Sequence, residues 1–182
     1  IGNLRQVFDR LRARGITLNP EKCRFGLSQV EYVGHIINEH GLDFSKHKRD
    51  NVLEFPTPTT HKGMKQFLGL ANYFRDHVKG HSMIVQPLQD MVSDYKKNKA
   101  LQWTPELTAL FNDVKDRVGN CPELFFMDDT LPVYLHTDAS DYGIGAYLFQ
   151  LEPSGKEKPI AFISKSLTKE RLRWSVPEKE AY

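Results

Sequence analysis

Apolar residues recur with the period of an α-helix in three stretches of the chain. Apolar side chains at i, i+3, i+4 and i+7 give a helix one face that can pack against other elements. The three stripes are Leu4, Val7, Phe8 and Leu11; Met64, Phe67, Leu70, Ala71, Phe74 and Val78; and Leu107, Leu110, Phe111, Val114 and Val118. We predict one helix around each stripe, and we expect the middle one to pack in a small helical bundle.

Capping residues and prolines place the ends of these helices. Gly15 is predicted to end the first helix as a C-terminal cap, and the stiff segment 56–60 precedes the second. Thr104 is predicted to cap the third helix, with Pro105 in its first position.

Weaker signals predict two shorter helices. One begins after Ser45 and runs to about residue 55, and the other begins at Pro87. A polar, basic linker is expected over residues 94–99.

The other apolar segments are predicted to be strands: 22–25 and 30–37 around the turn 26–29, and later 133–137, 144–149 and 159–164. A turn over 38–41 follows the first pair. Three successive strands and then a helix indicate an antiparallel sheet that opens an α/β arrangement. The predicted fold class is therefore α+β.

Composition excludes several classes of protein without choosing one. A formal net charge of +2 over 182 residues is too small to argue nucleic-acid binding from charge alone. Cys23 and Cys121 match no zinc spacing, so we expect a reduced intracellular protein. No apolar run reaches the roughly 20 residues of a membrane span, and no signal peptide is indicated. Because the chain starts at Ile1 and stops early in a predicted helix, we expect a piece of a longer polypeptide.

Asp138 is the first candidate for chemistry. It ends an apolar strand and precedes a glycine-containing hairpin. We expect it to be less accessible to water than a surface aspartate, so that a divalent metal ion is its natural partner. Two alternatives stay open. Segment 137–140 fits a strand exit that bonds backbone amides, and 141–145 is similar to the phosphate-binding hairpin of actin-like ATPases.

A second acidic candidate follows at the last predicted helix. Ser175 and Glu178 have the spacing of a capping box, in which the serine accepts from a backbone amide and the glutamate reaches back. Glu178 thus has a structural role, and Glu180 is left for another. If the helix packs across the sheet, Glu180 meets Asp138, and Mg²⁺ would relieve the repulsion between them. The alternative is an exposed helical glutamate.

Four segments near the C-terminus form an ordered series: Thr137-Asp-Ala-Ser-Asp-Tyr-Gly-Ile-Gly-Ala146, Leu148-Phe-Gln150, Pro159-Ile-Ala-Phe-Ile-Ser-Lys-Ser-Leu167 and Glu178-Lys-Glu-Ala181. The series resembles the start of the ribonuclease H domain in gypsy-type LTR-retrotransposon Pol polyproteins. Upstream, 4–11 with 18–25 is similar to the end of the reverse transcriptase palm, 32–35 to the hairpin that grips the primer, 67–73 to the first long thumb helix, and 103–104 to the link between thumb and nuclease.

The resemblance implies four parts: the palm end with its hairpin (1–42), the thumb (43–98), a connecting helix (99–123) and the N-terminal part of an RNase H-like domain (124–182). It implies that Asp138 and Glu180 are catalytic residues and metal ligands, two of four acidic residues that hold two Mg²⁺ ions for phosphodiester cleavage. The other two would lie beyond Tyr182, and the polymerase site upstream of Ile1, so the isolated chain is not expected to be catalytic.

Gly69 lies on the polar face of the predicted thumb helix. Glycine costs about 1 kcal/mol relative to alanine there, and core packing cannot explain it. Close approach of a duplex would, with Lys65 and Tyr73 one turn away on either side; the alternative is an accidental surface glycine. At Gly34 the choice lies between a strand bulge and a primer contact. The predicted nucleic-acid-binding residues are Tyr32, Gly34, His35, Lys65, Gly69, Asn72 and Tyr73.

The first functional hypothesis is thus a fragment of a retrotransposon reverse transcriptase and ribonuclease H, with Mg²⁺ as cofactor. Its expected partners are an RNA–DNA hybrid, a primer–template duplex and the rest of the polyprotein. It is expected in a cytoplasmic virus-like particle or in the nucleus, and the sequence does not indicate its oligomeric state. The alternatives are a non-catalytic nucleic-acid or protein interaction module from a domesticated or degraded element, and an actin-like half-domain, which Ile144 disfavours because a small hydroxyl residue usually stands there.

Overall fold

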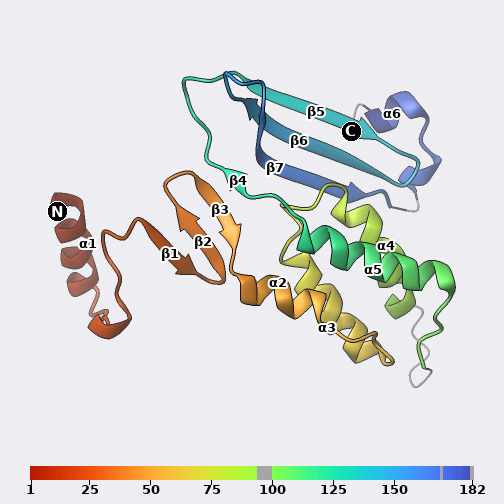
Figure 1. Cartoon of the computed structure of the whole chain (residues 1–182), viewed down its shortest axis with the longest axis horizontal. Helices are drawn as coiled ribbons and strands as arrows, with labels where there is room; N and C mark the ends of the chain where they lie inside the picture. Colours follow the sequence, from red (N-terminus) through yellow and green to blue (C-terminus); the bar gives the residue numbers. More distant parts are fainter. Residues whose placement is uncertain (94–99, 169, 181–182) are drawn as a thin grey trace.

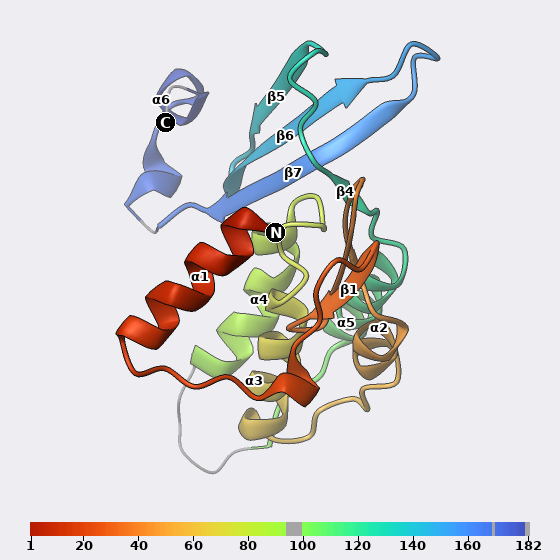
Figure 2. The same ribbon diagram turned by 90° about the vertical axis from the view of Figure 1, so that its left-hand side faces the viewer.

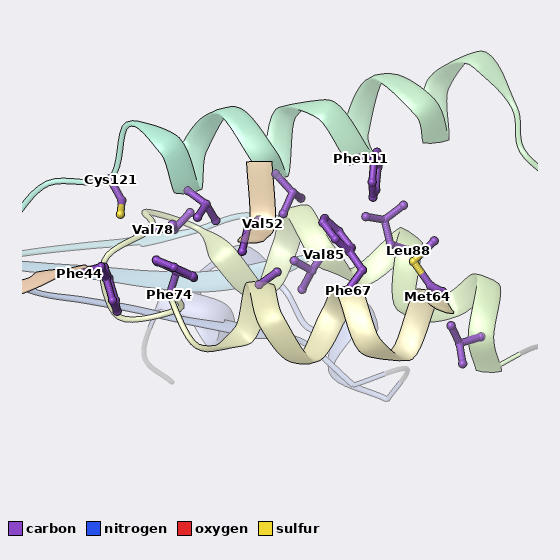
Figure 3. Close-up of a cluster of buried hydrophobic side chains, with 14 of the residues drawn as sticks. Phe44, Val52, Met64, Phe67, Phe74, Val78, Val85, Leu88, Phe111 and Cys121 are labelled. Atoms are coloured by element: carbon purple, nitrogen blue, oxygen red, sulfur yellow. The ribbon is translucent and has the colours of Figure 1, made fainter. Parts of the chain in front are cut away.

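Four helices enclose the main apolar core of the protein (Figure 1). The computed structural model describes residues 1–93, 100–168 and 170–180. The helices are α2 (Lys46–Leu53), α3 (His61–Asn72), α4 (His81–Ser93) and α5 (Pro105–Gly119). Figure 3 shows how their side chains meet, with Phe67 and Phe111 in ring contact at 4.4 Å. The predicted helical bundle is therefore present.

Threonine caps begin the two helices that had the clearest apolar stripes. The Thr104 hydroxyl accepts from the Leu107 amide at 3.3 Å, and Pro105 is the first residue of α5, as predicted. Thr60 caps α3 in the same way. Helix α3 ends at Asn72, before the end of its stripe, yet Phe74 is still buried because the following turns fold back onto the core.

Helix α4 begins six residues before the predicted start. Proline is favoured in the first turn of a helix, which is why the sequence predicts a start at Pro87, but this residue lies inside α4. Val85 and Leu88 are both buried in the core, and this burial outweighs the lost backbone hydrogen bond. The predicted linker 94–99 lies outside the described residues.

The N-terminal helix α1 (Gly2–Ala13) forms as predicted but buries none of its residues. Gly15 follows it with φ of +66°, a conformation suited to a helix C-cap. The predicted strand 22–25 is wrong. Residues Pro20–Lys22 form a short 3₁₀ helix, η1, because the Asn19 side chain accepts from the Glu21 amide at 2.9 Å and starts a turn.

The first sheet is antiparallel, with strand order β1-β2-β3-β4. Its strands are β1 (Gln29–Tyr32), β2 (His35–Asn38), β3 (Gly41–Phe44) and β4 (Leu124–Phe125). The segment predicted as one strand, 30–37, is thus two strands that pair with each other, Tyr32 opposite His35. The turn between β2 and β3 is where it was predicted.

The second sheet contains the three predicted strands, each somewhat longer: β5 (Val133–Ala139), β6 (Gly143–Leu151) and β7 (Glu157–Ser166), paired antiparallel in that order. A 3₁₀ helix, η2 (Arg171–Arg173), and a short helix, α6 (Val176–Glu180), follow. In both views the sheet lies on one side of the helices (Figures 1 and 2). Ser82 of α4 joins it to them, because its hydroxyl donates to the Ser164 carbonyl at 2.7 Å.

The predicted α+β class with antiparallel sheets is confirmed. The borders of the four predicted parts stay a prediction. Among the described residues, no helix is both long and apolar enough to cross a membrane.

Candidate nucleic-acid interface and carboxylate pocket

A two-residue turn joins β1 to β2 at the predicted primer-gripping hairpin. Val33 and Gly34 have φ of 51° and 81°, the left-handed pair that a tight hairpin turn requires. The strand-bulge alternative for Gly34 is therefore wrong. The Tyr73 hydroxyl donates to the Val33 carbonyl, and a Cβ added to Gly34 would lie 2.4 Å from Lys48 Cε. The turn is thus held between α2 and the end of α3.

His35 lies behind this turn in a cluster of rings. Its imidazole is 4.9 Å from the rings of both Phe44 and Tyr73. Burial is the main cause that lowers the His35 pKa below its ordinary value of 6.5; Lys48 acts in the same direction and Asp76 opposes it. The imidazole is therefore neutral at physiological pH, and it packs the hairpin against the thumb-like helix.

Three of the predicted nucleic-acid-binding residues line one pocket of about 630 Å³. They are His35, Asn72 and Tyr73, and Arg75 also lines it. Tyr32 stands outside it as an exposed side chain. The structure therefore brings the hairpin and the end of α3 together, although they are forty residues apart in the sequence.

The two remaining predicted contacts, Lys65 and Gly69, lie along the exposed face of α3 together with Asn72. Lys65, Gly69 and Asn72 are all exposed. A Cβ added to Gly69 would have no atom within 4 Å, so no packing contact within the described protein requires a glycine here. We name Lys65, Gly69 and Asn72 the α3 face. The role of the α3 face in binding stays a prediction.

Asp138 differs from its expected environment, because it is exposed. Its strand, β5, lies at the edge of the three-stranded sheet, with exposed neighbours along most of its length. An edge strand has no neighbour to cover its outer side. The expectation that Asp138 is shielded from water is therefore wrong for the described residues, and burial gives no reason for it to need a metal ion.

Asp138 and Glu180 nevertheless line the same pocket, of about 460 Å³. Glu180 comes from α6, which lies beside β5 (Figure 1). Both are hard oxygen donors, and Mg²⁺ is commonly held by one or two carboxylates together with waters and substrate phosphates. The pair thus fits such an ion, although no group of three or more candidate ligands occurs among the described residues.

The capping box at the start of α6 is present with one difference. The Ser175 amide donates to Glu178 Oε2 at 2.8 Å, as predicted, but the serine hydroxyl also donates to that oxygen, at 2.8 Å. These bonds lower the Glu178 pKa, the backbone bond being the larger cause. Glu178 therefore has the expected structural role.

Lys179 was not among the predicted site residues. It lines the carboxylate pocket, is buried, and donates to Asp141 Oδ1 at 2.9 Å. Buried lysines are rare unless paired, yet the sequence around Lys179 reads as an ordinary polar helix. Only the fold reveals this pair.

The glycine hairpin has a structural explanation. Gly143 donates its amide to Ser140 Oγ at 3.1 Å, and an added Cβ would lie 2.8 Å from Met83 Cγ. The amide is engaged within the turn and the glycine allows α4 to approach. These contacts speak against the phosphate-binding alternative for 141–145.

Residues 103–182 match the family described as the RNase H-like domain found in reverse transcriptase. Over 180 residues the chain is 32% identical to the Transposon Tf2-3 and Tf2-4 polyproteins of Schizosaccharomyces pombe. This match covers 99% of the chain but 13% of either polyprotein.

Two solved structures have the same fold. The foamy viral protease-reverse transcriptase in complex with an RNA/DNA hybrid is similar with a TM-score of 0.77 and 26% identity, over 99% of this chain and 24% of that one. The same protein in complex with double-stranded DNA is similar with a TM-score of 0.75 and 25% identity, over 97% of this chain and 36% of that one.

Proposed function

The chain belongs to the reverse transcriptase and ribonuclease H family of LTR-retrotransposon polyproteins, and on this basis we propose that it binds an RNA–DNA hybrid through the α3 face and the β1–β2 hairpin. The observation that carries the proposal is the fixed junction of these two elements. Tyr73 directly follows α3, and its hydroxyl donates to the Val33 carbonyl in the hairpin turn. The α3 face and the β1–β2 hairpin therefore form one continuous surface that a duplex can contact.

The chemistry of these surfaces suits a nucleic-acid backbone. An exposed lysine attracts phosphate, and the bare backbone at Gly69 allows a sugar-phosphate strand to approach closely. Tyr32 and His35 add rings beside the hairpin, and Asn72 adds a side-chain amide. Contacts of this kind position a duplex without reading its sequence.

We further propose that Asp138 and Glu180 contribute two ligands to a nuclease site of the complete protein. Mg²⁺ bound there would activate water and stabilise the leaving 3′ oxygen of the RNA strand. Both carboxylates are exposed, Asp138 on the edge strand β5 and Glu180 on α6 beside it. The complete protein would carry out RNA-directed DNA synthesis and ribonuclease H cleavage, in a cytoplasmic particle or the nucleus. We expect the 182-residue chain alone to bind but not to cleave.

The test is a titration of a fluorescent RNA–DNA hybrid at several salt concentrations. Lys65→Ala should weaken binding and reduce the slope of log affinity against log salt by about 1, because one phosphate contact is lost. Lys156→Ala, an exposed lysine in the turn between β6 and β7, is the matched control and should change neither quantity. Equal effects of the two substitutions, or none from Lys65→Ala, would contradict the proposal.

A further inference from the structure

Helix α6 has little apolar surface with which to dock. It contains five residues, and the only buried one is Lys179. Val176, its one large apolar residue, is 59% exposed. So short a helix is not stable alone in water. Within the described residues, something other than hydrophobic burial must hold α6 beside β5.

The Lys179–Asp141 ion pair is a polar contact that joins α6 to the β5–β6 turn. The Lys179 side chain is 6% exposed while that of Asp141 is 79% exposed. The Lys179 side chain therefore reaches from α6 to the β5–β6 turn, where its ammonium group donates to the Asp141 carboxylate. Asp141 follows Asp138 by three residues, and Lys179 directly precedes Glu180. The pair thus joins the two elements that carry the candidate metal ligands.

We propose that Lys179 is a positioning residue, which through Asp141 fastens α6 to the hairpin and so keeps Asp138 and Glu180 on one pocket. The ligand role of these two carboxylates rests on the proposed function; the fastening does not. The two residues of the pair differ in burial, so their removal should have different costs. Removing Asp141 leaves a buried ammonium group without its partner, which is costly, whereas removing the lysine leaves an exposed aspartate, which water solvates.

The first arm of the test needs no metal. In ¹⁵N NMR spectra of the 182-residue chain, the Lys179 ammonium should give a slowly exchanging signal that is lost in Asp141→Asn. Amide shifts of Val176, Glu178 and Glu180 should move in Asp141→Asn, and those of the residues around Asp141 should move in Lys179→Met, so that each change is read on the element that was not altered. Asp113→Asn removes an ion pair of similar length, 2.8 Å, on α5, and it should leave those shifts unchanged. Unmoved amides of Val176, Glu178 and Glu180 in Asp141→Asn, together with unmoved amides around Asp141 in Lys179→Met, would overturn the proposal.

The second arm uses Mn²⁺ as a paramagnetic probe of the pocket. In the unaltered chain it should broaden amides near both Asp138 and Glu180. In Lys179→Met it should broaden only those near one carboxylate, and the charge swap Asp141→Lys with Lys179→Glu should restore joint broadening. Joint broadening in Lys179→Met would refute the positioning role. If Mn²⁺ broadens neither segment in the unaltered chain, the proposed nuclease site fails, and the amide shifts of the first arm alone decide whether the pair holds the helix.

Discussion

Val33 has the least favourable backbone conformation of the candidate interface. Its φ of 51° lies in the left-handed region, where a β-branched residue is a true outlier and costs of order 1–3 kcal/mol. Asparagine or glycine would fit the turn without this cost. The strain persists because Tyr73 and Lys48 hold the turn from outside.

Val33→Asn should therefore stabilise the fold by about 1 kcal/mol, since asparagine tolerates the left-handed region. Urea denaturation followed by circular dichroism measures the change. Val7→Asn is the matched control, because Val7 is also exposed but lies in α1; it should give no gain. A loss of stability in Val33→Asn would show that the turn is not strained.

Three histidines give the fold a dependence on pH. Burial is the main cause that lowers the pKa of His35, His77 and His81 below 6.5. Between the lowered pKa values of these histidines and 6.5, the unfolded chain binds more protons than the folded one. The contribution of the neutral histidines to stability is therefore fully present above about pH 6.5 and is lost as the pH falls through the lowered pKa values. Urea midpoints should thus be lower at pH 5.5 than at pH 7.5.

His81→Gln separates this effect from general acid denaturation. His81 Nε2 lies 3.0 Å from the Ala71 carbonyl oxygen, and glutamine can still donate there but cannot titrate. The variant's midpoint should fall less between the two pH values than that of the unaltered chain. An equal fall, or a rise on acidification, would contradict the explanation.

At the scale of elements, the sequence predicted best where one local signal decided the structure. The stripe and the Thr104-Pro105 start were enough for α5, and the apolar segments 133–137, 144–149 and 159–164 were enough for β5 to β7. Predictions failed where tertiary contacts outweighed local preference. Pro87 looked like a helix start, but Val85 and Leu88 are in the core. Segment 22–25 looked like a strand, but no strand among the described residues pairs with it.

Gly69→Ala tests whether the glycine in α3 serves the close approach of a duplex at the expense of helix stability. The added Cβ meets no atom within 4 Å, so the helix should gain about 0.5–1 kcal/mol. The same methyl group should weaken binding of the RNA–DNA hybrid in the fluorescence titration proposed above. Asn51→Ala, at an exposed position of α2, should also improve its helix but leave affinity unchanged. Unaltered affinity in Gly69→Ala would mean that the glycine has no part in binding.

At the scale of the whole molecule, the junctions were the features that the sequence could not reveal. Apolar patterns indicate which faces are buried, but not which polar side chains meet across elements. The Ser82–Ser164 bonds, the Tyr73 bond to the hairpin turn and the Lys179–Asp141 pair each join residues at least thirty-eight positions apart. Exposure of Asp138 was missed for a related reason, because strand alternation does not say which strand lies at the edge. The site residues could be named from motifs, and their environment could not.

The central claim is that the α3 face and the hairpin bind a duplex together. Amide hydrogen exchange of the 182-residue chain, with and without a saturating RNA–DNA hybrid, tests it most directly. We predict slower exchange in residues 61–72 and 32–35 upon binding, with α5 unchanged. Protection confined to the β5–β7 sheet, or no protection in either predicted segment while the hybrid is bound, would contradict the claim.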